Sequence, residues 1–325
     1  MVAIGGMTRL THSGLSMVEW TLFGSTPPST DAAWLEMFEK YKQYPEYKLV
    51  NFNFSLEEFK RIFWWEYIHR MFGRFIGLVF IIPFLWFWIK GKLSSSLKPK
   101  LVFLLCLGGF QGLLGWYMVK SGLIQDPDVS HYRLAMHLTT AFLTFSYTFW
   151  LALGLIYPKP TTQVSGMKNS IRGLLMLLIV QIVWGAYVAG LNAGKVYNSW
   201  PLMGDSLIAD SVTAMSPWWS NFVEGLAGVQ FVHRYLAYAV VAWVIYLVIK
   251  SRKKVLASSQ KAGINFLAIA VSFQFLLGIF TLLYAVPVSL GLLHQLGAFI
   301  LLGGTIFCLH RFSKTSTDFA QAIAS

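Results

Sequence analysis

Long apolar stretches, separated by short polar segments, recur along the chain. A helix needs about 20 consecutive apolar residues to cross the hydrocarbon core of a bilayer, and a stretch of that length favours a helix over a strand. The pattern predicts seven complete membrane-spanning helices, at residues 67–89, 101–119, 134–157, 173–191, 229–249, 264–284 and 289–309.

The polar stretch 25–61 carries helix signals of its own. Apolar residues at helical spacing in DAAWLEMFEKYKQY predict a short surface helix. Ser55 and Glu58 form a capping box that predicts the start of the helix leading into the next span. In the second part of the chain, 194–224 takes the corresponding place, so both segments could cover whatever the helices hold.

The chain is internally duplicated. The stretch GGMTRLTHSGLSMVEWTLFG from Gly5 aligns without a gap with GAYVAGLNAGKVYNSWPLMG from Gly185. Three further matches follow in the same order: the two HR pairs at His69 and His233, QGLLG with QFLLG, and HLTTAF with HQLGAF. Four weak matches in one order indicate a repeat.

Each copy holds an even number of helices, so both copies face the same way and are related by an axis along the membrane normal. The predicted fold is an all-α integral membrane protein with two tandem pseudo-symmetric four-helix bundles, residues 1–157 and 158–325. The alignment places the start of the first helix about seven residues before Met1, so we expect the given chain to lack that start.

Composition agrees with a membrane protein, since 56% of the residues are hydrophobic and 12% charged. The net charge of +12 does not indicate a nucleic-acid partner, because the basic residues form short clusters between the spans. These clusters place the connecting loops and the C-terminus in the cytoplasm. We expect a bacterial inner (plasma) membrane, with lipid as the surrounding partner; a mitochondrial inner membrane fits equally. Cys106 and Cys308 lie in predicted spans and are interpreted as packing residues.

Four of the seven histidines occur in the repeat matches. Each lies a few residues inside a helix that starts from the outer side, at a shared depth of roughly 10 Å. Two imidazoles from two helices of one bundle suit heme iron. The alternatives are hydrogen bonds to neighbouring helices, or zinc, which the absence of nearby cysteines or paired carboxylates disfavours. The four are His69, His137, His233 and His294, with His131 as the second candidate in its helix.

Arginines accompany these histidines. Arg70 and Arg234 directly follow two of them and are candidates to pair with heme propionates. Arg74 and Arg133 are further candidates, with lipid headgroups as the alternative partner.

Glu66 distinguishes the two halves, because its counterpart in the repeat is Gln230. A carboxyl at bilayer depth costs roughly 2.5–3.5 kcal/mol, so it needs a partner or a chemical role. An ion pair with Arg70 is one reading. We favour a role in chemistry, in which the first half reacts and the second half carries electrons.

The stretches GGMTRLTHSGLSMVEW, LEEFKRIFWWEYIHRMFGRFIG and QGLLGWYMVKSGL resemble the heme A synthase family, in the branch shared by proteobacteria and mitochondria. The resemblance spans nearly the whole chain. It implies eight helices in two four-helix halves and an oxidoreductase acting on a CH group. The implied reaction oxidises the C8 methyl of heme O to a formyl group, which gives heme A for terminal oxidases.

The same resemblance implies particular site residues. The C-terminal half would hold heme B as cofactor between His233 and His294, and the N-terminal half would receive the substrate heme O near His69 and His137. The glutamate matching Glu66 would be needed for activity. Some relatives carry a cysteine pair in the first outer loop, which 25–61 lacks, so a mechanism that requires those thiols does not apply.

Two other classes compete with this reading. A non-enzymatic diheme b-type electron carrier would place histidines in the same pattern, and a transporter is disfavoured by parallel repeats. The heme O synthase is an expected partner. The sequence leaves open the electron donor, the oxidant and whether copies of the chain form a homo-oligomer.

Overall fold

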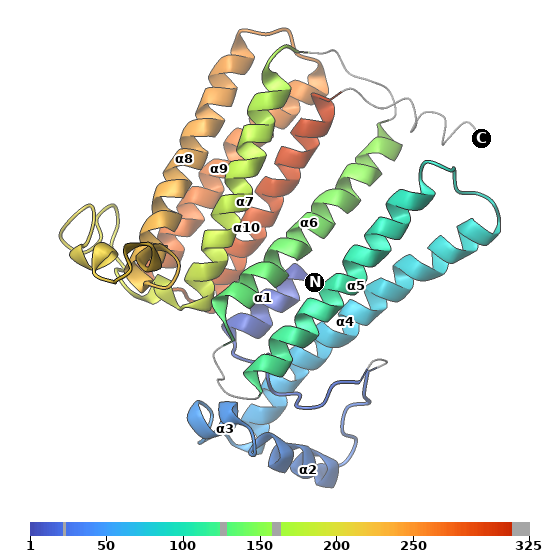
Figure 1. The fold of residues 1–325 in the computed structure, drawn as a ribbon, viewed down its shortest axis with the longest axis vertical. Helices are drawn as coiled ribbons and strands as arrows, with labels where there is room; N and C mark the ends of the chain where they lie inside the picture. The colour runs from blue at the N-terminus through green and yellow to red at the C-terminus, as the bar shows by residue number, and fades with distance from the viewer. Residues whose placement is uncertain (22–23, 124–128, 158–163, 314–325) are drawn as a thin grey trace.

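The computed structural model describes residues 1–21, 24–123, 129–157 and 164–313. The described residues form helices joined by loops (Figure 1). In chain order these are α1 (Val2–Leu10), α2 (Asp31–Tyr41), α3 (Pro45–Leu49), α4 (Leu56–Ile89), α5 (Lys98–Gly122), α6 (His131–Ile156), α7 (Met167–Gly190), the short 3-10 helices η1 (Ala193–Lys195), η2 (Asp210–Thr213) and η3 (Trp218–Phe222), then α8 (Leu226–Arg252), α9 (Ser258–Leu283) and α10 (Val288–Arg311).

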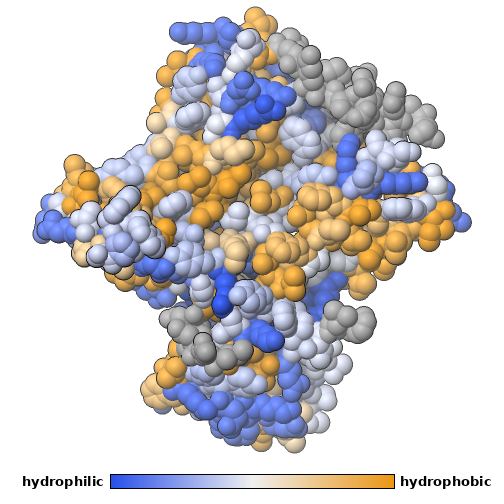
Figure 2. Space-filling model, viewed as in Figure 1, coloured by the Kyte–Doolittle hydropathy of each residue, from blue (hydrophilic) through white to orange (hydrophobic). Residues whose placement is uncertain are grey.

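The prediction of seven spanning helices is confirmed: α4 to α10 are each long and apolar enough to cross a membrane. Apolar side chains gather across the middle of the face shown in Figure 2, and hydrophilic ones lie toward its ends. The protein is therefore a multi-pass membrane protein, and lipid would cover the exposed apolar side chains of these helices.

The longest helix, α4, begins outside the membrane. Its 34 residues extend over roughly 50 Å, more than the hydrocarbon thickness of about 30 Å. The predicted capping box starts it, because the Ser55 side chain accepts from the Glu58 backbone while the Glu58 side chain accepts from the Ser55 backbone.

The predicted surface helix is α2, which starts at its N-cap Thr30. Helices α2 and α3, together called the outer unit below, lie against the lower end of α4 (Figure 1). Aromatic side chains hold this outer unit together: Trp34, Phe38 and Tyr41 from α2 pack with Phe59 and Phe63 of α4. The outer unit is thus fixed to the same helix that carries Glu66.

Helices α7 to α10 share a continuous apolar core that includes Leu174, Leu247, Leu267 and Leu301. Cys308 is buried in this core, as expected of a packing residue. The same expectation is wrong for Cys106, which α5 exposes on its outer surface.

Contacts between the earlier and later helices run through α1, α6, α7 and α10. Phe142 of α6 and Ile182 of α7 pack with Leu302 and Ile306 of α10. Arg9 of α1 donates to the carbonyls of Ala189 and Gly190 at the end of α7. The two repeat copies therefore meet along buried apolar surface, and the histidine-bearing helix α10 lies in that contact.

Candidate functional site

Two of the predicted histidines form a ring pair. His233 of α8 and His294 of α10 have ring centroids 6.4 Å apart and planes at 86°. Two metal–nitrogen bonds of about 2 Å, plus about 1 Å from each nitrogen to its ring centre, make roughly 6 Å. The separation fits one iron held between the two imidazoles.

Each of the four histidines packs against a glycine of a neighbouring helix. A Cβ on these glycines would lie 3.0–3.3 Å from the imidazole Cε1, closer than the ordinary carbon contact of about 3.5–4.0 Å. Glycine is therefore what lets each ring lie so near the adjacent backbone. The pairs are Gly5 with His69, Gly115 with His137, Gly185 with His233, and Gly278 with His294.

Sequence reasoning missed these glycines, although it had aligned them. The small residue that touches each ring comes from a different helix, and the sequence does not say which helices lie side by side. The signal was present in the match of Gly5 to Gly185 and in the shared glycine of QGLLG and QFLLG.

Two glutamines also support the histidine helices, and sequence reasoning gave them no role. Gln111 Nε2 donates to the His137 carbonyl at 2.9 Å and lies 3.1 Å from its Nδ1. Gln274 Nε2 makes the same two contacts with His294, at 2.9 and 3.1 Å. Both glutamines begin the QGLLG and QFLLG matches, so equivalent contacts recur in both copies.

The buried Nδ1 atoms of His69 and His233 have no hydrogen-bond partner among the residues that the structure describes. Buried side-chain nitrogens rarely stay unpaired, so an added ligand group would complete these positions. Glycine clearance, the spacing of His233 and His294, and unpaired ring nitrogens together fit a porphyrin iron. The described part of the chain holds no group of three or more His, Cys, Asp or Glu that could hold a bare metal ion.

The first copy differs at the corresponding pair. His69 lies on α4 and His137 on α6. Among the described residues, no ring contact joins these two in the way that His233 meets His294. Among the described residues, the close pair of histidine rings is thus found in the second copy, although the glycine contacts match in both.

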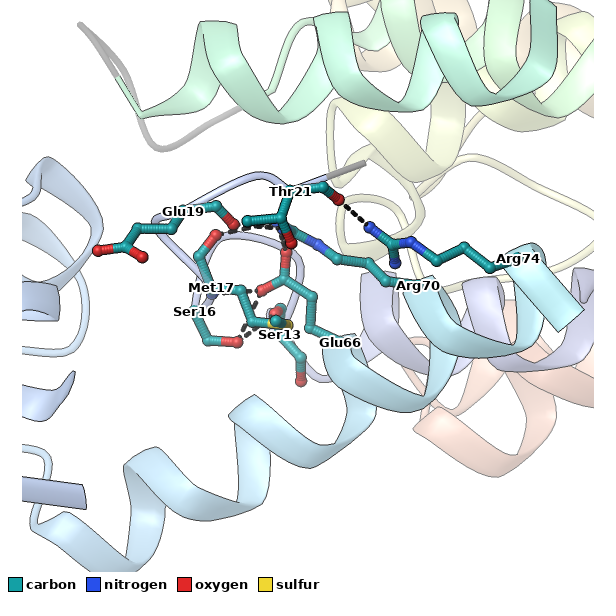
Figure 3. Close-up of polar contacts among 8 residues, drawn as sticks. All are labelled: Ser13, Ser16, Met17, Glu19, Thr21, Glu66, Arg70 and Arg74. Atoms are coloured by element: carbon teal, nitrogen blue, oxygen red, sulfur yellow. Dashed lines mark hydrogen bonds and ion pairs between the residues drawn. The ribbon is translucent and has the colours of Figure 1, made fainter. Parts of the chain in front are cut away.

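Glu66 lies in a buried cluster of donors (Figure 3) and is 2% exposed. It forms an ion pair with Arg70, so the pairing considered from the sequence is present. Its Oε2 also accepts from Ser16 Oγ and from the Met17 backbone N–H, each at 2.7 Å. Arg70 in turn donates to the carbonyls of Met17 and Glu19, both at 2.9 Å. These contacts attach the loop after α1 to helix α4, with the Glu66 carboxylate at their centre.

In the second copy the matching arginine also binds the loop, but the side chain beside it donates a hydrogen bond to the loop, whereas Glu66 accepts from it. Arg234 donates to the carbonyls of Tyr197 at 2.5 Å and Ser199 at 3.0 Å, the repeat counterparts of Met17 and Glu19. It also donates to Gln230 Oε1 at 3.1 Å. The Gln230 amide nitrogen then donates to the Ala193 carbonyl at 2.9 Å. Loop donors meet the carboxylate in the first copy, whereas loop acceptors meet the amide in the second.

The arginines predicted to bind propionates mostly contact the protein itself. Arg70 and Arg234 each keep a buried Nε with no hydrogen-bond partner, which leaves one donor for a ligand group. Arg74 donates to the Thr21 carbonyl at 2.6 Å. The Arg133 guanidinium lies 4.7 Å from the ring centre of a tyrosine on α5.

His131, the second candidate ligand of α6, occupies the first position of that helix. Its Nε2 lies 2.8 Å from the Val223 carbonyl, and its ring packs edge-on against Tyr187. It joins α6 to the second outer loop and lies two turns from His137. The structure therefore places His131 at the boundary of α6, in contact with the loop that holds Val223.

A second buried carboxyl lies in the outer unit. Glu46 is 5% exposed and accepts a hydrogen bond from the Tyr41 hydroxyl at 3.1 Å, which itself accepts from Asn51 at 2.8 Å. Burial raises the pKa of Glu46 to about 8, and the negative charge of Glu66 adds to the rise. Glu46 is therefore largely protonated at neutral pH.

These features define an all-helical, multi-pass membrane protein with a repeated arrangement of histidine, glycine and arginine and one acid where the repeat has an amide. The chain matches the COX15-CtaA family model, described as cytochrome oxidase assembly protein, over residues 1–306. It is 52% identical to the heme A synthase of Flavobacterium psychrophilum over 319 residues, which cover 97% of this chain and 94% of that protein.

Other relatives agree. The heme A synthase of Flavobacterium johnsoniae is 52% identical over 320 residues, covering 97% of this chain and 94% of the relative. That of Parvibaculum lavamentivorans, at 45% over 315 residues, covers 97% and 90%. The chain belongs to the COX15-CtaA family, and the resemblance identified from its motifs is confirmed.

Proposed function

We propose that this protein is a heme A synthase, which oxidises the C8 methyl of heme O to a formyl group. The observation that carries the proposal is the difference between the two copies: an ionisable Glu66 with Arg70 in one, a neutral Gln230 with Arg234 in the other. A reaction in one half alone would account for an acid in one copy and an amide in the other.

The two halves would divide the work. Residues 1–157 would receive heme O as substrate near His69 and His137, and residues 158–325 would hold heme B between His233 and His294. The close ring pair supports the second assignment, because both imidazoles already have the spacing that one iron needs. When bound, heme B would supply one-electron transfer between the substrate site and an external partner.

The residues around Glu66 suit an ionised carboxylate. Three donors, from Arg70, Ser16 and Met17, point at it. Such a carboxylate can stabilise positive charge that develops on the substrate as electrons leave the methyl carbon. Acceptance of a proton by Glu66 is the alternative, and it requires the contact with Arg70 to open.

The chemistry at the methyl group would take two successive two-electron oxidations. The first converts the methyl to a hydroxymethyl group, and the second gives a gem-diol that loses water to leave the aldehyde. In each oxidation a water molecule would supply the oxygen atom, and two protons and two electrons would leave, the electrons to an external acceptor. The buried setting of Glu66 and its neighbours would keep bulk water away from the partly oxidised substrate.

We propose a location in the bacterial inner membrane with the C-terminus in the cytoplasm. The basic clusters between spans support this orientation. The outer unit and the loop 191–225 would then face the opposite side, above the histidines. The heme O synthase is the partner that would deliver the substrate.

The test is the Glu66→Gln variant, expressed with a heme O synthase. We expect it to keep its b-type heme and to accumulate heme O or the hydroxylated intermediate, identified by mass after pigment extraction. Heme A at the wild-type level would reject the role of Glu66. The matched variant in the other copy is Gln230→Glu, which places the same substitution in reverse where no reaction is proposed.

His233→Ala tests the cofactor assignment separately. Loss of one imidazole should abolish the b-type spectrum, while His69→Ala should leave that spectrum in place and stop heme A formation. An unchanged spectrum in His233→Ala would refute the assignment of heme B to the C-terminal half.

A further inference from the structure

Ser16 lies where the two repeat copies differ in side-chain chemistry. It is 0% exposed, and its hydroxyl is 2.7 Å from Glu66 Oε2. Its counterpart in the second copy is Val196, which has no hydroxyl. Serine therefore accompanies the acid, and valine accompanies the amide Gln230.

The surrounding backbone explains why the two positions change together. In the second copy the Gln230 amide nitrogen donates directly to the Ala193 carbonyl. The matching carbonyl in the first copy belongs to Ser13, and a carboxylate facing it would place two acceptors together. The Ser16 hydroxyl lies between them, 3.0 Å from the Ser13 carbonyl and 2.7 Å from Glu66.

A hydroxyl has one proton to donate, and the charged oxygen is the stronger acceptor. The shorter distance to Glu66 agrees with this choice. The Met17 N–H, 2.7 Å from the same Oε2, provides the second donor. Together with Arg70, which pairs with Oε1, these contacts fix both the position and the rotation of the carboxylate.

We propose that Ser16 is a positioning residue for the reaction: its hydroxyl holds the Glu66 carboxylate in the orientation that turnover needs. This inference rests on the proposed function of Glu66. Ser16 does not itself touch the substrate. Its hydroxyl supplies a hydrogen-bond donor to the Glu66 carboxylate, at a place where the loop of the second copy accepts a hydrogen bond from an amide.

The experiment compares Ser16→Ala, Ser16→Val and Ser16→Thr in the full chain, in nanodiscs supplied with heme O. Ser16→Val introduces the residue of the other copy, and Ser16→Thr restores a hydroxyl. The matched control is Ser13→Ala, which removes another buried serine hydroxyl from the same loop, one that lies 2.6 Å from Thr11 and makes no contact with Glu66. The b-type spectrum of each variant counts the folded molecules.

We expect Ser16→Ala and Ser16→Val to lower kcat by roughly tenfold, the effect of losing one hydrogen bond to a charged group, with KM for heme O unchanged. Ser16→Thr should recover most of the turnover. Infrared difference spectra against Glu66→Gln should show the carboxylate band of Glu66 shifted in Ser16→Ala and unshifted in Ser13→Ala. This band is measured without any substrate.

The outcomes separate the two proposals. Wild-type kcat and an unshifted band in Ser16→Ala would overturn the role of Ser16, while inactivity of Glu66→Gln would still support the role of Glu66. A loss of turnover in Ser13→Ala equal to that in Ser16→Ala would also overturn it, because any damage to the loop would then suffice. Wild-type heme A in Glu66→Gln would instead refute the proposed role of Glu66, on which this inference rests.

Discussion

The contact between Gly278 and His294 makes the proposed heme B site sensitive to a single methyl group. In Gly278→Ala the added Cβ would lie 3.0 Å from the imidazole Cε1. Ordinary contact needs about 3.5–4.0 Å, so the ring or the helix must move by about 0.5–1 Å. A metal–ligand distance tolerates a change of only about 0.2 Å. The substitution should therefore weaken the proposed bond between His294 and the heme iron.

Overpacking of this kind costs about 1–3 kcal/mol, which corresponds to a roughly five- to 150-fold weaker affinity for heme. The helix itself gains, because alanine is favoured over glycine inside a helix by about 1 kcal/mol. A loss of heme thus cannot come from a broken helix. The assay is heme B per purified chain, together with the rate at which heme transfers to excess apomyoglobin.

Gly303→Ala is the matched control. It lies on α10, the helix of His294, and its Cβ would make an ordinary contact of 3.5 Å with Phe145. We expect wild-type heme content there. If Gly278→Ala also kept the wild-type content and transfer rate, the reasoning that glycine sets the position of the ring would be refuted.

Three further predictions concern the surroundings of the site. The pKa of Glu46 is raised to about 8 in the folded protein, so its contribution to stability is complete below about pH 4.5 and is lost as pH rises through about 8. Pulse proteolysis should therefore cut the outer unit more readily at pH 9 than at pH 6. Equal cutting of the wild type and Glu46→Gln at both pH values would contradict this. Arg234→Lys should lower the free energy of unfolding by about 1–3 kcal/mol, because lysine lacks the planar fork that holds several carbonyls; an unchanged melting temperature would argue against the docking role. His131→Phe should leave the Val223 carbonyl unpaired and destabilise the protein by a similar amount of about 1–3 kcal/mol with heme content intact, whereas loss of heme O binding would mark His131 as a ligand.

The spanning helices and the repeat could be predicted from the sequence, because both depend on local information. Hydrophobic length alone located α4 to α10, and the capping box at Ser55 placed the start of α4. The outer helix α2 followed from its apolar spacing. Such signals lie within one segment and survive whatever the segment packs against.

The contacts of the arginines could not be predicted in the same way. Arg70 and Arg234 bind backbone carbonyls, and every residue of a loop carries one. A bond to the backbone therefore leaves no mark on the sequence of the loop. Heme propionates were the expected partners of these arginines, because a sequence identifies only charged side chains and implied ligands as acceptors for a guanidinium.

The glycine contacts could be predicted only in part. The alignment contained Gly5 and Gly185, but their role depends on which helix lies beside which histidine. That knowledge requires the packing of helices distant in the sequence. The hydrogen-bond partners of Glu66 could not be predicted either, because they depend on whether the loop presents N–H groups or carbonyls to the helix.

Arginine docking to the backbone also bears on how one half could acquire a reaction after gene duplication. Because Arg70 and Arg234 hold main-chain oxygens, the loop stays attached whatever side chains it bears. Mutations at Ser16 or Val196 could then accumulate without detaching it. With this attachment in place, the side chains around one arginine could change while those in the other copy stayed as they were.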